Sequence, residues 1–288
     1  MTAKRVSVIN MKGGVGKTTL SIHLAYYLAK HKNNKVLLID LDPQANASIV
    51  GIPESSLKDY YKNPNKKTSF DLFFNWMQQY GPFPKMSPVS IPLGDCYYQS
   101  YCSSNNNDWL HIVPSHITLS SILRGVSIGP YELDNFLNAQ AQKQYDFIII
   151  DCAPTYSVLT TLALNATKQV LIPMTAEPFG VHGTELMKYV LEEHKHDYGS
   201  EIKIVGVVFT MWKNNMPVYA QKAETSIKSE WGTSNIFARK ISHDDNYKII
   251  NGKNFDGGNG NIDIMNSALH QDKKDEFKYF VEEFLTRI

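Results

Sequence analysis

Runs of apolar residues recur along the chain, and several are apolar at every position rather than at alternate ones. Examples are VLLID, FIIID, VLIPM and IVGVVF. Such runs are typical of parallel strands that are covered on both faces of a sheet. The pattern predicts strands at Arg5–Asn10, Lys35–Asp40, Trp109–Pro114, Asp146–Asp151, Gln169–Pro173 and Ile202–Thr210.

Stretches with helical spacing of apolar residues lie between these strands. They predict helices at Thr18–His31, Ser115–Leu123, Tyr131–Gln142, Val158–Asn165, Thr184–His196 and Met216–Trp231. Because strand and helix alternate, we expect an α/β fold in which helices cover both faces of a doubly wound, mostly parallel sheet.

Three parts of the chain depart from this alternation. Residues 53–107 contain many prolines, the polar run SSNNND, the tyrosine-rich CYYQSY and a helix-like core, SFDLFFNWMQQY. They lack the apolar mass for a core of their own, so we interpret them as an elaboration on the sheet, either a partner-binding surface or a tolerated insertion. Residues 251–261 are predicted to form a flexible loop. A last helix at about 272–288 carries Phe277, Phe280, Val281, Phe284, Leu285 and Ile288 on one face. A single domain over residues 1–288 is therefore expected.

Composition places the chain among ordinary globular proteins. The net charge is +1, with 43% hydrophobic and 20% charged residues, so bulk charge indicates neither nucleic acid nor an acidic substrate as a partner. The three cysteines, Cys96, Cys102 and Cys152, are too few and too scattered for a disulfide framework or a zinc site. No apolar run reaches membrane-spanning length, and the N-terminal apolar stretch is interpreted as a strand, so a cytoplasmic location is predicted.

A glycine-rich segment, GGVGKT, lies between the first predicted strand and the first predicted helix. This is the context of a P-loop, in which glycines let successive backbone amides point at phosphate oxygens and the helix N-terminus adds positive potential. We expect Lys17 to bridge the β- and γ-phosphates and the Thr18 hydroxyl to ligate magnesium. The predicted ligands are ATP and Mg²⁺, and the predicted nucleotide-binding residues here are Gly13, Gly14, Val15, Gly16, Lys17, Thr18 and Thr19.

A second lysine, Lys12, stands directly before the glycines. The sequence KGGVGKTT resembles the deviant Walker A box of the ParA/MinD family of P-loop ATPases. The resemblance implies that Lys12 reaches across a dimer, in which two ATP molecules are sandwiched, to the phosphates bound by the other subunit. Such a lysine would act as an arginine finger does, by adding positive charge where negative charge develops in the transition state.

Two further segments extend the resemblance, KVLLIDLDPQANAS at residues 35–48 and YDFIIIDCAPTYS at residues 145–157. It implies that Asp42 orients the attacking water, that Asp40 helps hold the magnesium hydration shell, and that Asp151 contacts magnesium through water. Alternate residues at a strand end point the same way, so Asp40 and Asp42 can face one metal-bound phosphate. The resemblance also implies that adenine contacts come from the strand end at VVFTMW, which makes Thr210 a candidate for such a contact.

Within the family the chain is most similar to the short, Soj-type partition ATPases. This similarity implies an ATP-dependent homodimer that binds double-stranded DNA without sequence preference, associates with the nucleoid, and meets a ParB-like or other adaptor that stimulates hydrolysis. Residues 203–253 hold eight Lys or Arg against four acids. That local excess lies where the resemblance implies a DNA-binding surface, and it makes Arg239, Lys240 and Lys248 the candidate DNA contacts. A solvated face without function is the alternative interpretation.

Three other functions are alternative interpretations of the sequence. A membrane-bound, MinD-type positioning ATPase would end in a basic amphipathic helix, whereas the last helix here carries Asp275, Glu276, Glu282 and Glu283, so a membrane is not expected as a partner. An iron–sulfur protein would need a second cysteine to match Cys152. An ATP-dependent metabolic enzyme of the same fold stays open, although such enzymes generally need a large additional domain. The favoured hypothesis is an ATPase that positions a plasmid, a chromosome or another cargo.

Overall fold

The computed structural model describes residues 2–73, 91–124, 128–213, 215, 217–247 and 262–288. In these residues seven strands form one sheet. The strands are β1 (Lys4–Val8), β2 (Lys35–Leu41), β3 (Tyr98–Cys102), β4 (Trp109–Val113), β5 (Phe147–Cys152), β6 (Gln169–Met174) and β7 (Lys203–Phe209). Their order across the sheet is β3-β4-β2-β5-β1-β6-β7.

Every pairing in the sheet is parallel except that of β3 with β4. The predicted α/β class with a mostly parallel sheet is therefore confirmed. The edge strand β3 was not predicted, because its sequence YQSYC has none of the continuous apolar character of the central strands. It belongs to the region interpreted as an elaboration, and it lengthens the sheet.

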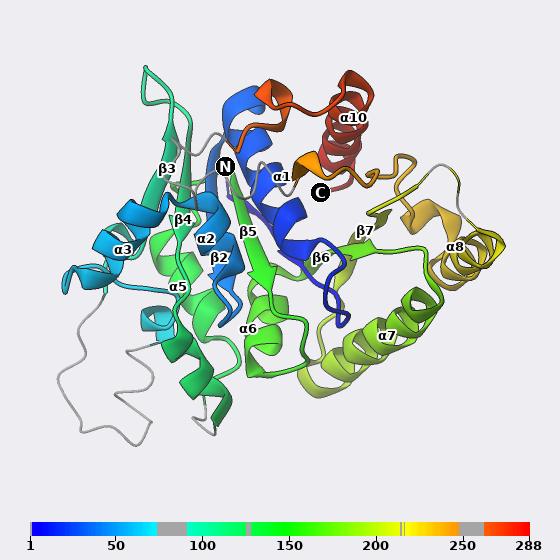
Figure 1. Ribbon diagram of the computed structural model, residues 1–288. Coiled ribbons are helices and arrows are strands. Elements are labelled where there is room, and N and C mark those ends of the chain that lie inside the picture. The colour runs from blue at the N-terminus through cyan, green and yellow to red at the C-terminus, as the bar shows by residue number, and fades with distance from the viewer. Residues whose placement is uncertain (1, 74–90, 125–127, 214, 216, 248–261) are drawn as a thin grey trace.

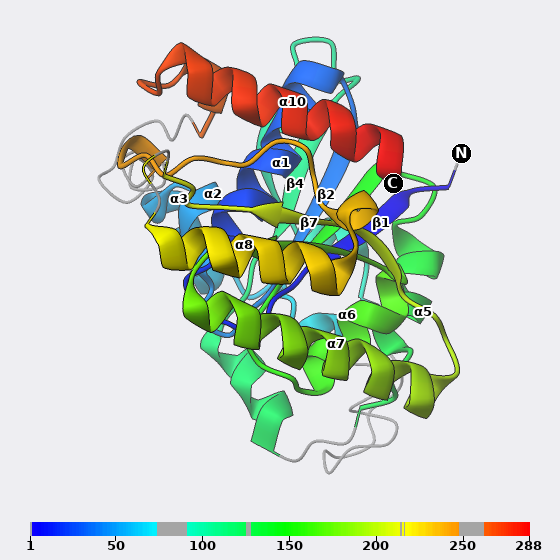
Figure 2. The same ribbon diagram turned by 90° about the vertical axis from the view of Figure 1, so that its right-hand side faces the viewer.

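Helices cover both faces of the sheet (Figure 1). They are α1 (Lys17–Lys32), α2 (Asn46–Gly51), α3 (Glu54–Lys62), α5 (Glu132–Gln140), α6 (Val158–Thr167), α7 (Pro178–Tyr198), α8 (Val218–Trp231) and α10 (Gln271–Arg287). One apolar core lies between the strands and α1 with α10, and a second lies on the opposite face under α5, α6 and α7. Figure 2 shows these two layers above and below the strands.

Several predicted elements differ in detail from the observed ones. The predicted helix at Ser115–Leu123 consists of 3₁₀ turns over Ile117–Arg124. α7 begins at Pro178, earlier than the predicted Thr184, and the short helices α2 and α3 had not been predicted. The helix-like core at residues 69–80 falls mostly outside the described residues, and Asp71–Phe73 within it is a 3₁₀ turn. Residues 251–261 also lie outside them.

The last helix, α10, uses its apolar face inside the molecule. Phe277, Phe280, Val281 and Phe284 are at most 1% exposed and pack on the sheet and α1. Its acidic residues hold the chain before it, since Glu283 accepts hydrogen bonds from the Ala238 amide. No helix among the described residues is long and apolar enough to cross a membrane.

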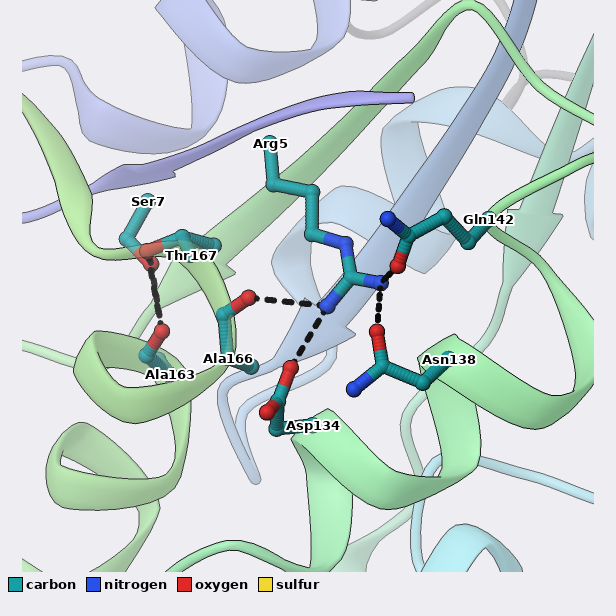
Figure 3. A network of polar contacts seen from close by, with 8 residues as sticks. All are labelled: Arg5, Ser7, Asp134, Asn138, Gln142, Ala163, Ala166 and Thr167. Atoms are coloured by element: carbon teal, nitrogen blue, oxygen red, sulfur yellow. Dashed lines mark hydrogen bonds and ion pairs between the residues drawn. The ribbon is translucent and has the colours of Figure 1, made fainter. Parts of the chain in front are cut away.

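A polar cluster joins β1 to the helices at the amino end of the strands (Figure 3). The Arg5 guanidinium donates to the Asp134 carboxylate at 2.7 Å, the Asn138 carbonyl at 2.7 Å and the side chain of Gln142. These three partners follow one another at four-residue intervals; Asp134 and Asn138 lie on α5, and Gln142 lies just after its end. Arg5 also donates to the main-chain carbonyl of Ala166 in α6. The cluster therefore fixes α5 and α6 against β1.

Candidate nucleotide-binding site

The loop between β1 and α1 lies at the carboxyl end of the central strands, where ligands of open α/β sheets bind. Gly14 and Gly16 have φ angles of 74° and 80°, values that favour glycine. α1 then begins at Lys17, so its free amides face the loop. A cavity of about 360 Å³ opens here, and its lining includes Gly13, Gly14, Gly16, Lys17, Thr18, Thr19, Asp42 and Pro154. The structure thus brings together most of the predicted phosphate-binding residues.

Lys17 is a nearly buried cation, with 7% of the residue exposed. Its ammonium donates to the main-chain carbonyl of Lys12 at 2.9 Å. Burial lowers the pKa of Lys17, while the nearby Asp151, Cys152 and Asp42 oppose that shift. In the described part of the chain no carboxylate lies within ion-pair distance of it. The site therefore holds a positive charge that an anionic ligand would neutralise.

Two hydroxyl groups of α1 hold the Asp151 carboxylate. Thr18 donates to one oxygen and Ser21 to the other, both at 2.8 Å. Burial raises the pKa of Asp151 well above its usual range, and these two hydrogen bonds oppose the shift. Oxygen ligands of this kind suit Mg²⁺, so the donor set fits the predicted ion. Sequence reasoning missed Ser21; its place one helical turn after Lys17 was the available signal.

Asp40 and Asp151 are paired residues in the register of β2 and β5. Asp40 is fully buried, and its carboxylate accepts hydrogen bonds from the amide and hydroxyl of Ser48 and from the Asp42 amide. Burial, followed by the nearby charge of Asp151, raises the pKa of Asp40 well above its usual range. Asp40 thus anchors the start of α2, and its predicted part in a magnesium hydration shell stays a prediction.

Asp42 lies at the wall of the cavity, as expected for a residue that orients water. Its carboxylate accepts a hydrogen bond from the Gln44 amide at 2.9 Å, and its carbonyl accepts one from the Ala45 amide. This tight turn, with Ala45 at a φ of 56°, fixes the direction of the chain after β2.

Lys12 has its ammonium directed to a different place from Lys17. It forms an ion pair with Glu177 at 2.8 Å and a hydrogen bond with the Thr175 hydroxyl at 3.3 Å. The Lys12 amide is held by the Asn10 side chain, which also donates to the Pro173 carbonyl. Lys12 is thus fixed at its backbone and partly exposed at its tip, and its predicted action across a dimer stays a prediction.

A second cavity of about 330 Å³ adjoins the P-loop. Its lining shares Gly16 and Thr19 with the loop and is otherwise formed by Leu20, Thr210, Met211, Ile241, Ser242, His243, Asp244, Tyr247 and Phe277. The Thr210 hydroxyl donates to the Val15 carbonyl at 2.8 Å, which ties the P-loop to the end of β7. Thr210, which the sequence predicts as an adenine contact, does line this cavity, and that contact stays a prediction. Residues 241–244, Tyr247 and Phe277 were not predicted, because they come from segments with no nucleotide-binding motif.

The predicted DNA-binding residues differ in their surroundings. The Arg239 guanidinium lies 5.0 Å from the ring centroid of Tyr279. Lys240 forms an ion pair with Glu224 at 2.7 Å and lies 3.2 Å from the ring centroid of Trp212, so its charge already has partners within the chain. Lys248 lies outside the described residues. Of the two residues that the structure describes, Lys240 is paired with a carboxylate and Arg239 is not.

Comparisons with known proteins agree with this geometry. A family model described as an AAA domain matches residues 3–204. The uncharacterized protein MJECL24 of Methanocaldococcus jannaschii is 30% identical over 224 residues, which make up 76% of this chain and 77% of that protein. The chromosome-partitioning ATPase Soj of Thermus thermophilus is 28% identical over 230 residues, or 80% of this chain and 77% of Soj.

A solved structure resembles the whole chain. The putative plasmid partition protein of Borrelia burgdorferi, bound to AMPPNP, has a TM-score of 0.70 and 25% identity and covers 100% of both chains. Fold and site together define a P-loop ATPase. Within that class, the chain belongs to the ParA/Soj family of partition ATPases, which confirms the resemblance inferred from the deviant Walker A box.

Proposed function

We propose that this chain binds ATP and Mg²⁺ in the glycine-lined cavity and hydrolyses ATP to ADP and phosphate within a positioning cycle. The buried ammonium of Lys17 carries the proposal, because it lacks an ion-pair partner among the described residues and faces a cavity lined by P-loop glycines. A triphosphate supplies the anion that this charge requires. ATP analogues bound to relatives, such as AMPPNP in the Borrelia protein, support the choice of ligand.

Each part of the cavity has its own task in this reaction. The loop amides, the N-terminus of α1 and Lys17 bind and orient the phosphates. Thr18 and Asp151 would hold Mg²⁺, which neutralises charge on the phosphate oxygens. Asp42 orients the attacking water from its place on the cavity wall. Ser21 keeps the Asp151 carboxylate in place through its 2.8 Å hydrogen bond.

The remaining catalytic charge is supplied by a second copy of the chain. Lys12 must leave Glu177 to reach the phosphates of that copy, and an exposed ion pair of this kind contributes only about 0.2–1 kcal/mol. Hydrolysis by an isolated subunit is therefore slow, and dimer formation completes the site. In the homodimer the ATP base lies in the second cavity, beside Thr210.

The ATP-bound dimer binds double-stranded DNA without sequence preference and is released when a ParB-like or other adaptor stimulates hydrolysis. Local positive charge in residues 203–253 supports this step, with Arg239 as the first contact to test and Lys240 and Lys248 as further ones. Such a dimer is cytoplasmic and associated with the nucleoid, and its cargo is a plasmid, a chromosome or another body.

The test of the cycle is the fluorescence anisotropy of a labelled random-sequence duplex, titrated with protein in ATP and in ADP at two salt concentrations. We expect salt-sensitive binding in ATP alone. Arg239→Ala should weaken it and lower the salt slope by about 1, whereas Lys58→Ala, on the remote helix α3, should have no effect. Equal binding in ATP and ADP, or no binding, would refute the DNA step while leaving ATP hydrolysis to be judged by phosphate release.

A separate prediction concerns Asp42. Asp42→Ala should lower hydrolysis by about 10²–10⁴-fold, the range typical of a group that acts on the reacting proton or water, and should accumulate the ATP-bound dimer. Light scattering with ATP and Mg²⁺ measures that dimer, with ADP as the control. A variant that stays monomeric with ATP, or that hydrolyses ATP at the normal rate, would show that Asp42 has another role.

A further inference from the structure

The second cavity has one wall that is held from outside the P-loop. This wall is the segment Ile241–Asp244. It lies beside the chain that leaves β7 and forms a parallel bridge with it between Ser242 and Trp212. The Trp212 amide donates to the Ile241 carbonyl at 3.1 Å, and the His243 amide donates to the Trp212 carbonyl at 2.7 Å. The main chain of the segment is thus fixed on the side of the sheet.

The other side of the same wall is held by α10. Both carboxylate oxygens of Glu276 accept hydrogen bonds from Ser242, one from its amide at 3.0 Å and one from its hydroxyl at 2.9 Å. Lys273, one turn earlier, donates to Glu276 at 3.2 Å. The next residue of the helix, Phe277, itself lines the cavity together with Tyr247. One carboxylate therefore joins the last helix to a cavity wall 34 residues earlier in the chain.

We propose that Glu276 is a positioning residue for recognition of the nucleotide base. It fixes Ser242, and with it one wall of the second cavity, where the base is proposed to lie. This inference rests on the proposed ATP binding. Glu276 does not line the cavity, so it acts through the wall and not by touching the ligand. Because the wall is ordered before the base binds, binding does not have to pay the entropy cost of ordering it, and the affinity for ATP is higher.

The proposal separates the two halves of the nucleotide. The phosphates are held by the P-loop, which Glu276 does not contact, whereas the base depends on the wall that Glu276 fixes. Loss of Glu276 should therefore weaken the binding of ATP. It should not change the binding of inorganic tripolyphosphate, which has no base. General damage to the domain would weaken both ligands alike.

The experiment measures dissociation constants of the full chain for Mg²⁺-ATP and Mg²⁺-tripolyphosphate by calorimetry. Glu276→Ala is expected to weaken ATP about 10-fold and to change tripolyphosphate affinity less than about 2-fold. Glu276→Gln, which can still accept from the Ser242 amide and donate to its hydroxyl, should restore most of the ATP affinity. The matched control is Glu283→Ala, which removes a carboxylate two turns along α10 that holds the Ala238 amide, away from the cavity.

The outcomes are distinct. The positioning role would be overturned if Glu276→Ala and Glu283→Ala bound ATP with equal affinity. It would also be overturned if Glu276→Ala lost affinity for ATP and for tripolyphosphate to the same extent. A wild-type chain that binds neither ligand would instead refute the proposed ATP binding. Should Glu276→Ala fail to fold, Glu276→Asp keeps the charge but is one methylene shorter; a selective loss of ATP affinity of about 3-fold supports the proposal, and normal ATP affinity refutes it.

Discussion

Arg5 and Lys17 are two cations near the central strand, and each is only 7% exposed. Burial lowers the pKa of both side chains. They differ in their partners. Arg5, at the amino end of the strand, meets the carboxylate of Asp134 and two side-chain carbonyls, whereas Lys17, at the other end, meets one main-chain carbonyl.

This difference distinguishes a structural charge from a binding charge. A buried cation with a carboxylate beside it has its charge compensated within the chain and fixes the elements around it. A buried cation without one carries a desolvation cost that an anionic ligand can relieve. Arg5 and Lys17 are equally buried, so only their hydrogen-bond and ion-pair partners distinguish the structural cation from the binding one.

The largest expected effect comes from Lys17→Ala. It removes the cation that we propose stabilises charge on the transferred phosphate, and hydrolysis should fall by about 10²–10³-fold. The stability of the nucleotide-free protein should not fall, because burial disfavours the Lys17 charge more than the nearby Asp151 and Asp42 favour it. Phosphate release and thermal unfolding without nucleotide measure the two effects. A variant that unfolds at a much lower temperature but still hydrolyses ATP would place Lys17 with Arg5 among structural cations.

Lys12→Ala sharpens the comparison with a third cation, one that is exposed at its tip. Hydrolysis should fall by about 10²-fold, while ATP affinity should change less than about 3-fold, since the Lys12 side chain contacts Glu177 and not the cavity. Calorimetry with a non-hydrolysable analogue and a turnover assay with the adaptor measure the two quantities. Unchanged adaptor-stimulated turnover would eliminate the role of Lys12 across the dimer.

Arg5→Met should have the opposite profile to Lys17→Ala. It leaves Asp134 without its cation, and we expect a loss of about 2–3 kcal/mol in the free energy of unfolding, less than for a fully buried pair because the Asp134 side chain is 23% exposed. ATP affinity should stay within about 2-fold. Urea denaturation gives the stability, with Lys4→Met as the exposed neighbouring control. A selective loss of ATP affinity would contradict the structural assignment.

The smallest effect is a pH dependence of the nucleotide-free protein. The pKa values of Asp40 and Asp151 are raised in the folded state, so the native protein holds more protons than the unfolded chain, and stability falls as pH rises. We expect the melting temperature to fall by about 2–4 °C between about pH 6.5 and 8. Burial lowers the pKa of His111 to about 4. His111 is therefore neutral in both the folded and the unfolded state above the ordinary pKa of histidine, and it does not contribute to the pH dependence of stability in this range. A rise in melting temperature would contradict the sign, and Asp40→Asn should reduce the slope.

The sequence was sufficient for the central sheet and for the position of the glycine-rich loop beside the first cavity. Fully apolar strands and the P-loop are local patterns, and one strand–loop–helix unit carries Lys12, Lys17 and Thr18 together. Asp42 and Asp151 were predicted from the resemblance of two further short segments to the ParA/MinD family, and Asp42 does lie at the cavity wall. These features depend on short stretches of chain, and so they can be predicted from it.

The features that were missed depend on contacts between distant segments. β3 has mixed polarity and is a strand because β4 pairs with it. Ser21 is an ordinary helix residue until β5 brings Asp151 to it, and Ser242 belongs to an irregular segment held by a glutamate from α10. Lys240 looked like a free cation, although Glu224 on α8 pairs with it. Partner choice of this kind is a property of the folded chain.

The two edges of the sheet also restrict how copies of this protein can associate. At one edge, a shift of register between Gln99 and Tyr101 interrupts the ladder of β3. At the other, the Phe237 and Ile241 amides donate to β7, so the chain after α8 occupies part of its open side. Irregular and covered edges discourage the addition of a strand from another molecule. The fold is thereby protected against edge-to-edge aggregation, and the segment that provides part of this protection continues into the wall of the second cavity.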